Sequence, residues 1–134
     1  FGKSNAPYDR PGATRYEWLS RDQLEVDAYV ADEQCGFVLS PGSLIDLSQG
    51  SAISQNKLSL LRIPLDLPIY IFSGSEDPVH GEQADLDRLV NTYRKRGLTQ
   101  LSYKLYPGGR HEMFNETNKD EVVTDLVQWL EQQL

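Results

Sequence analysis

A short, continuous apolar run, Ile69–Tyr70–Ile71–Phe72, constrains the fold of this chain more than any other feature. Pro68 precedes the run and Ser73–Gly74 follows it. A strand that is apolar on both faces is typical of parallel sheets that helices cover on both sides. The run therefore predicts a buried strand of an α/β domain, which needs further strands and helices around it.

The residues after this run complete a strand–helix–strand–helix order. A helix is predicted over residues 82–96, ended by Gly97, from an apolar stripe at helical spacing: Leu86, Leu89, Val90 and Tyr93. Apolar and polar residues alternate over 101–106, which predicts a second strand near a sheet edge. A last helix is expected from about Asn118. This order implies a parallel strand pair joined by a right-handed crossover.

The beginning of the chain carries no strand pattern. Prolines and glycines interrupt residues 1–17, which we expect to be irregular. A helix is predicted over 21–31, with Ser20 as its N-cap and Leu19 and Leu24 as a hydrophobic staple.

Pro41–Gly42 is expected to break the chain before a second helix, from Ser43 to about Ser54. We therefore divide the chain into a helical segment, 1–60, and a strand-containing segment, 61–134. Two strands do not make an α/β domain. Since the chain also begins at Phe1 rather than at a methionine, we expect the remaining strands to come from polypeptide that precedes it.

Two ionisable residues follow the predicted strands. Asp77 lies in the turn after the first strand, where Pro78 keeps it out of the helical region. His111 lies after the second strand, next to Gly108–Gly109. Parallel strands place both loops at one sheet edge, where ligands bind. An acid followed by a base is the chain order of the Ser…Asp…His triad.

These segments resemble a known family. Residues 67–79, ending in Ser73–Gly74–Ser75–Glu76–Asp77–Pro78–Val79, look like the acid-bearing strand and turn of lipase-like α/β-hydrolases, and residues 105–112 look like their histidine loop. Trp18–Leu19–Ser20–Arg21–Asp22, with residues 26–29 and Cys35–Gly36–Phe37, resembles the cap of the monoacylglycerol lipase and lysophospholipase branch, which is serine aminopeptidase S33-like.

The resemblance implies an α/β-hydrolase fold, of which this chain is the C-terminal part. Asp77 would be the triad acid, His111 the general base, and residues 1–60 a helical cap over the acyl pocket. The implied activity is hydrolysis of carboxylic esters of lipid-like substrates, with no cofactor.

The nucleophile elbow of this family, Gly-x-Ser-x-Gly, is absent, because no two glycines of the chain lie four positions apart. Ser43, Ser51 and Ser75 lie beside glycines but lack the elbow's context. We expect the missing N-terminal half of the fold to supply the nucleophile, and this chain alone to be inactive.

Two other functions fit the same fold. An aspartate at the elbow would make a dehalogenase or an epoxide hydrolase. A catalytically silent binding protein would keep the fold without the reaction. A metal site at His80, His111, Asp77 and Glu112 has suitable residue types but no tight ligand spacing.

Neighbouring residues have plainer interpretations. His80 is expected to be solvated, and Arg110 to form a surface ion pair. Met113 fits either the acyl pocket or the core, and Cys35 a small buried apolar site.

The net charge of −7 argues against nucleic acid as a partner. No apolar run reaches transmembrane length, so no transmembrane anchor is expected. A single cysteine fits a reducing compartment, and we expect a cytoplasmic protein.

Overall fold

The computed structural model describes residues 4–54 and 56–134; the first three of the residues expected to be irregular, 1–3, lie outside this range. Its elements follow one another as η1 (Ala6–Tyr8), α1 (Gln23–Ala31), α2 (Pro41–Ser54), α3 (Lys57–Leu60), β1 (Ile69–Gly74), α4 (Gln83–Arg96), β2 (Leu101–Tyr106), η2 (Met113–Asn115) and α5 (Lys119–Glu131).

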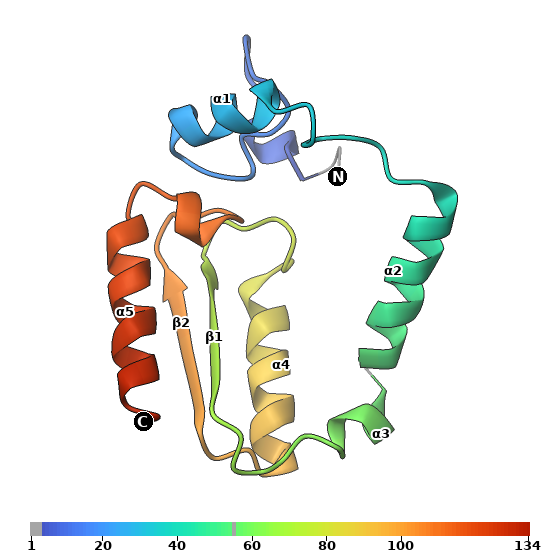
Figure 1. Cartoon of the computed structure of the whole chain (residues 1–134), viewed down its shortest axis with the longest axis vertical. Helices are drawn as coiled ribbons and strands as arrows, with labels where there is room; N and C mark the ends of the chain where they lie inside the picture. Colours follow the sequence, from blue (N-terminus) through green and yellow to red (C-terminus); the bar gives the residue numbers. More distant parts are fainter. Residues whose placement is uncertain (1–3, 55) are drawn as a thin grey trace.

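The sheet consists of the two predicted strands. β1 and β2 pair in parallel, in a register that runs from Ile69 opposite Leu101 to Gly74 opposite Tyr106. Figure 1 shows the pair between α4 on one side and α5 on the other, with α1 beyond the carboxyl ends of the strands. Within the described residues no strand precedes β1, as the sequence predicts.

β1 is less buried than its apolar sequence predicts. Its first five residues are half-buried, and only Gly74 is fully buried. Among the described residues β1 pairs with β2 alone, so its other edge carries no neighbouring strand. An apolar strand with one open edge is the pattern of a strand that belongs inside a larger sheet.

The helix between the strands begins and ends as its sequence predicts. The Asp85 carboxylate accepts a hydrogen bond from the Glu82 N–H, which satisfies an otherwise unpaired donor at the helix start. Gly97 ends α4 in the left-handed conformation, at φ 101°. Leu86 and Val90 are buried on one side of the helix.

The expected start of the first helix is wrong by two residues. Asp22, not Ser20, is the N-cap of α1, and its carboxylate accepts from the Leu24 N–H at 3.0 Å. The Ser20 hydroxyl instead donates to the Asn115 carbonyl at 2.7 Å. Leu19 is buried but Leu24 is 79% exposed, so the expected staple does not form.

Pro41 does not break the chain but begins α2. Proline suits the first turn of a helix, because the N–H that it lacks would have no partner there. α2 therefore starts two residues earlier than expected, and none of its residues is buried. The division into a segment 1–60 and a segment 61–134 stays a prediction.

The core lies between the sheet and α5. Tyr106, Met113 and Val122 are buried together, and Phe72 of β1 packs against them. The Tyr106 hydroxyl donates to the Asp125 carboxylate of α5 at 2.7 Å. This contact gives the buried phenol a partner and ties the last helix to the end of β2.

Gly74 sets how closely the loops after β1 and β2 approach one another. A Cβ at this position would collide with backbone atoms of Gly109 and Arg110, which cannot move aside as a flexible side chain does. We expect Gly74→Ala to lower the free energy of unfolding by about 1–3 kcal/mol, the usual cost of overpacking.

Urea unfolding followed by circular dichroism measures this effect, and Gly50→Ala is the matched control. Gly50 lies in α2, where an added Cβ meets nothing within 4 Å. Alanine there favours the helix, so the control is expected to keep or raise the unfolding midpoint. Equal midpoints for Gly74→Ala and the unchanged chain would contradict the prediction.

Candidate active site

The loops after β1 and β2 are bonded to each other at the carboxyl ends of the strands. The Glu76 N–H donates to the Gly109 carbonyl at 2.9 Å, and the Gly108 N–H donates to the Ser75 hydroxyl at 2.8 Å. These contacts bring together the two loops that carry Asp77 and His111, as the parallel order of the strands predicts.

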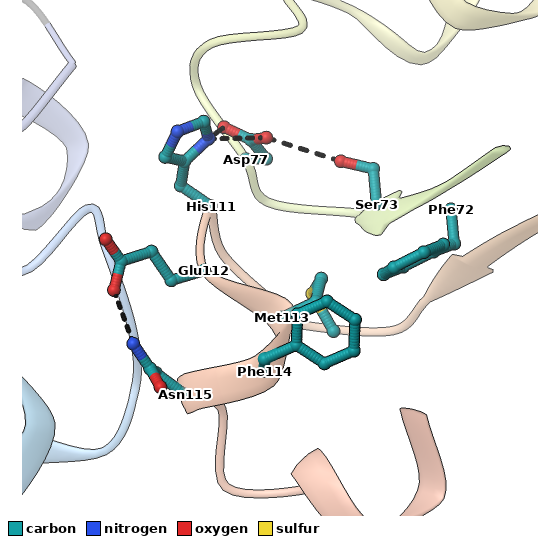
Figure 2. A pocket seen from close by; sticks show the side chains of 8 residues that line it. All are labelled: Phe72, Ser73, Asp77, His111, Glu112, Met113, Phe114 and Asn115. Carbon is teal, nitrogen blue, oxygen red and sulfur yellow. Dashed lines mark hydrogen bonds and ion pairs between the residues drawn. The ribbon is translucent and has the colours of Figure 1, made fainter. Parts of the chain in front are cut away.

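Asp77 and His111 form a hydrogen-bonded pair (Figure 2). The Nδ1 of His111 lies 3.0 Å from Oδ2 and 3.2 Å from Oδ1 of Asp77. The carboxylate is 7% exposed and also accepts from the Val79 N–H at 2.8 Å and the Ser73 hydroxyl at 3.3 Å. A carboxylate acceptor fixes the proton on Nδ1, which leaves Nε2 as the basic nitrogen.

The same contacts set the protonation of the pair. Burial alone would raise the pKa of Asp77, but hydrogen bonds from His111 and from the Val79 N–H outweigh it and hold this pKa below its ordinary value. The hydrogen bond to Asp77 raises the pKa of His111, against the opposing effect of burial. At neutral pH, Asp77 is therefore ionised, and His111 is a stronger base than a free imidazole.

A cavity of about 440 Å³ opens beside the pair. Its wall comes from the end of β1, the histidine loop and η2, and comprises Phe72, Ser73, Asp77, His111, Glu112, Met113, Phe114 and Asn115. Figure 2 shows Met113 and Phe114 on the side of the cavity away from Asp77. The arrangement places an acid–base pair beside a cavity whose wall also includes the apolar side chains of Phe72, Met113 and Phe114.

Met113 belongs to the core and also lines the cavity. Its side chain is 4% exposed and is buried together with Tyr106. Cys35 differs from the expected buried site: it is only partly buried, and its thiol is free.

His80 is not the solvated residue that the sequence suggested. It is half-buried, and its Nε2–H donates to the Gly74 carbonyl at 2.9 Å. The turn after Asp77 folds the imidazole back onto the end of β1, and its proximity helps to lower the pKa of Asp77. Local sequence alone does not indicate that the His80 side chain turns back toward β1.

Ser43, Ser51 and Ser75 lie outside the wall of the cavity. Ser43 and Ser51 belong to α2, and the Ser75 hydroxyl accepts from the loop of β2, so none of the three lines the cavity. Ser73 does line it, but its hydroxyl donates to Asp77 rather than to Nε2 of His111. Within residues 4–54 and 56–134, no group of three or more histidine, cysteine or acidic side chains is arranged to hold a metal ion.

Within the described residues, Arg110 does not make the surface ion pair expected from its sequence. Its guanidinium donates to the carbonyls of Glu17 and Ser20 and lies over the Tyr8 ring, 4.1 Å from the ring centroid. The Tyr8 hydroxyl in turn donates to the Glu76 carbonyl in the acid loop. The N-terminal segment therefore contacts both loops of the site, a feature that no local pattern reveals.

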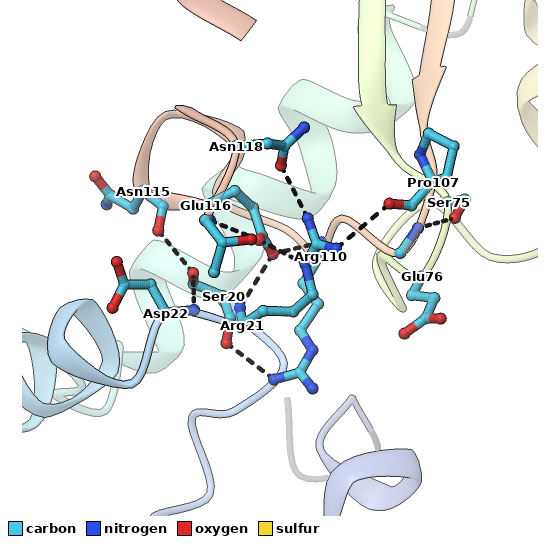
Figure 3. A network of polar contacts seen from close by, with 12 residues as sticks. Ser20, Arg21, Asp22, Ser75, Glu76, Pro107, Arg110, Asn115, Glu116 and Asn118 are labelled. Atoms are coloured by element: carbon cyan, nitrogen blue, oxygen red, sulfur yellow. Dashed lines mark hydrogen bonds and ion pairs between the residues drawn. The ribbon is translucent and has the colours of Figure 1, made fainter. Parts of the chain in front are cut away.

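A buried carboxylate joins this segment to the histidine loop (Figure 3). Glu116 has no exposed surface and accepts four hydrogen bonds. Arg21 donates from its backbone N–H at 3.1 Å and from Nε at 2.8 Å, while the Arg110 and Thr117 N–H groups donate at 2.9 and 3.0 Å. Burial acts to raise the pKa of Glu116, but these donors outweigh it and lower the pKa.

The described part of the chain holds no helix of the length and apolarity that a membrane crossing requires.

Three comparisons show which known proteins the chain is similar to. The Hydrolase_4 family model, described as serine aminopeptidase, S33, matches residues 4–118. A monoacylglycerol lipase of Mycolicibacterium smegmatis is 27% identical over 117 residues, which make up 84% of this chain and 38% of that protein. The crystal structure of a highly thermostable carboxyl esterase from Bacillus coagulans, in complex with glycerol, matches with a TM-score of 0.82 at 24% identity, over 98% of this chain and 43% of that one.

The chain thus spans about two fifths of the length of these two proteins. The structural match extends over nearly all of it and confirms the predicted α/β-hydrolase fold. Because the family model covers most of the sequence, the chain belongs to the serine aminopeptidase S33-like (Hydrolase_4) family of α/β-hydrolases.

Proposed function

We propose that this chain carries the acid and the base of a serine hydrolase that cleaves carboxylic esters of lipid-like substrates, of the monoacylglycerol or lysophospholipid type. The observation that carries the proposal is the Asp77–His111 pair beside a partly apolar cavity. A buried carboxylate on Nδ1 of an imidazole is the arrangement that prepares a general base.

Each residue has a defined part in the proposed reaction. A serine from outside this sequence attacks the ester carbonyl while Nε2 of His111 takes the hydroxyl proton. His111 then gives this proton to the leaving alcohol, and later takes one from the water that releases the acyl group. Asp77 stays ionised, holds the imidazole by Nδ1 and stabilises the imidazolium that forms in each step.

The nucleophile and the oxyanion donors are proposed to come from the N-terminal half of the fold. The chain has no Gly-x-Ser-x-Gly, and one oxyanion donor is normally the residue after the nucleophile. Residues 1–60 are proposed as the cap. No cofactor is required, because positioned side chains supply every proton transfer.

A lipid-like substrate suits the shape and chemistry of the cavity. Phe72, Met113 and Phe114 offer apolar surface within reach of the base, while His111 and Asp77 line the same cavity. An acyl chain against the aromatic side would leave its ester group near Nε2. The names of the two relatives, a lipase of monoacylglycerols and a carboxyl esterase, fit the same chemistry.

A fluorophosphonate probe, followed by intact mass, tests this proposal. The 15.2 kDa chain alone is expected to gain no adduct. The longer polypeptide that joins it to an elbow serine is expected to gain one, and to lose it in the His111→Ala variant. Ser43→Ala, which changes an exposed serine of α2, is the matched control and should label normally.

Other labelling results would favour the alternative functions. An adduct on the 15.2 kDa chain would contradict the proposed origin of the nucleophile. A longer polypeptide that never labels would contradict serine chemistry and favour an aspartate nucleophile or a silent binding protein. Turnover of a haloalkane or an epoxide would separate these two.

A further inference from the structure

Trp18 lies against the face of the proposed base. The centroids of its ring and of the His111 imidazole are 5.1 Å apart, with 37° between the ring planes. The indole is 6% exposed, whereas the His111 side chain is 37% exposed. One side of the imidazole therefore meets a fixed aromatic wall, and Asp77 holds its Nδ1.

The backbone around Trp18 also fixes the histidine loop. The His111 N–H donates to the Trp18 carbonyl at 3.3 Å, and the Glu112 N–H donates to the Leu19 carbonyl at 2.8 Å. These two successive contacts place the loop beside the segment that carries the indole. They involve only backbone atoms, so a change of the Trp18 side chain leaves their donors and acceptors in place.

The position of Trp18 is itself fixed by polar contacts on its C-terminal side (Figure 3). Ser20 donates to the Asn115 carbonyl, and Arg21 pairs with the buried Glu116. Arg110, the residue before the base, donates to the Ser20 carbonyl at 2.9 Å. The indole and the imidazole are thus joined through two bonded segments and do not meet by chance on a surface.

An indole face attracts a cation more strongly than any other aromatic ring does. The charged groups that act on His111 are Asp77, across the hydrogen bond, and Glu112, its neighbour in sequence. Both attract the imidazolium, and Asp77 does so at Nδ1. An aromatic face adds to this attraction when the ring becomes charged and contributes little while it is neutral.

We propose that Trp18 is a positioning residue for His111, whose indole holds the imidazole against Asp77 and stabilises the imidazolium ion. Its consequence for catalysis rests on the proposed function. In each proton transfer the base passes through its charged form, so a residue that favours this form acts on the reaction through His111.

Proton NMR titration of the 134-residue chain tests the contact directly. The chain has two histidines, so His80 serves as an internal reference, and the spectrum of His80→Gln assigns the signals. In Trp18→Leu the acid ionisation constant of His111 is expected to rise about threefold, the effect of losing a modest cation–π contact. Trp18→Phe keeps a weaker aromatic face and is expected to give a smaller rise.

Trp129→Leu is the matched control. This second tryptophan stacks on Tyr70, with ring centroids 5.6 Å apart, and lies in α5, so its loss removes aromatic packing without touching His111. The His111 constant should stay unchanged there, and that of His80 should stay unchanged in both Trp18 variants.

A His111 constant that is unchanged in Trp18→Leu would overturn the proposal, and so would an equal rise in Trp129→Leu. If Trp18→Leu does not fold, Trp18→Phe decides by the same measurement. In the polypeptide that supplies the nucleophile, the acid limb of the kcat/KM profile should move to lower pH in Trp18→Leu. Failure of the proposed function would appear separately, as an absence of fluorophosphonate labelling in the unchanged protein.

Discussion

Changing Asp77 to Asn is expected to lower kcat for ester hydrolysis about 10⁴-fold in the polypeptide that joins this chain to its nucleophile. The carboxylate accepts from Nδ1 of His111 at 3.0 Å and so keeps Nε2 free of a proton. An amide at this position presents an N–H₂ group as well, which favours the opposite tautomer and leaves the imidazolium without its counter-ion. The base then carries its proton on the wrong nitrogen.

Steady-state hydrolysis of a p-nitrophenyl ester measures this loss, with Asp46→Asn as the control for the same chemical change. Asp46 is exposed on α2, and its amide should leave kcat unchanged. A loss of less than about tenfold in Asp77→Asn would contradict the role of Asp77 as the triad acid.

The pair also predicts a pH dependence. Because the pKa of His111 is raised, the base stays protonated to a higher pH than a free imidazole, and the acid limb of the activity profile shifts upward with it. For stability, the contribution of His111 is present below its unfolded pKa and lost as pH rises through the folded value. The contribution of Asp77, whose pKa is lowered, is lost as pH falls through its folded value.

The strands, the helix between them and the acid–base pair follow from local sequence. An apolar run between a proline and a serine–glycine pair, and an alternating segment further on, predict β1 and β2. Once these strands are parallel, loops at their carboxyl ends must meet. Asp77 and His111 could therefore be paired from sequence without knowledge of any distance.

The contacts that support the base could not be predicted in this way. Trp18 meets His111, and Arg21 meets Glu116, across most of the chain, and neither a period nor a turn motif relates the members of either pair. Ser20 illustrates the error that results: its sequence context suits a helix cap, but its hydroxyl donates to the carbonyl of Asn115 in η2 instead. Tertiary contacts override local preference where a polar group is buried.

Glu116 provides the second large effect, on stability. Glu116→Ala is expected to lower the free energy of unfolding by about 3 kcal/mol, because it leaves the donors that surround the carboxylate without an acceptor in a buried site. Arg21 is partly exposed, with 31% of its side chain accessible. Water can therefore accept hydrogen bonds from its guanidinium in the variant, which offsets part of the loss. The backbone N–H of Arg110 also loses its acceptor.

Urea unfolding at neutral and acid pH measures the contribution of Glu116, and Glu25→Ala is its matched control. Glu25 accepts from Lys119 at 2.8 Å and so links α1 to α5, as another ion pair between the N-terminal and C-terminal parts of the chain. Unlike Glu116, both of these side chains are partly exposed. Loss of the Glu25 carboxylate should leave the midpoint close to that of the unchanged chain. The effect of Glu116 should shrink as pH falls, because its lowered pKa confines its contribution to the pH range in which the folded carboxylate is ionised. If the loss of unfolding free energy in Glu116→Ala were as large at acid pH as at neutral pH, the packing of the Glu116 side chain, and not its ionised carboxylate, would be what stabilises the fold.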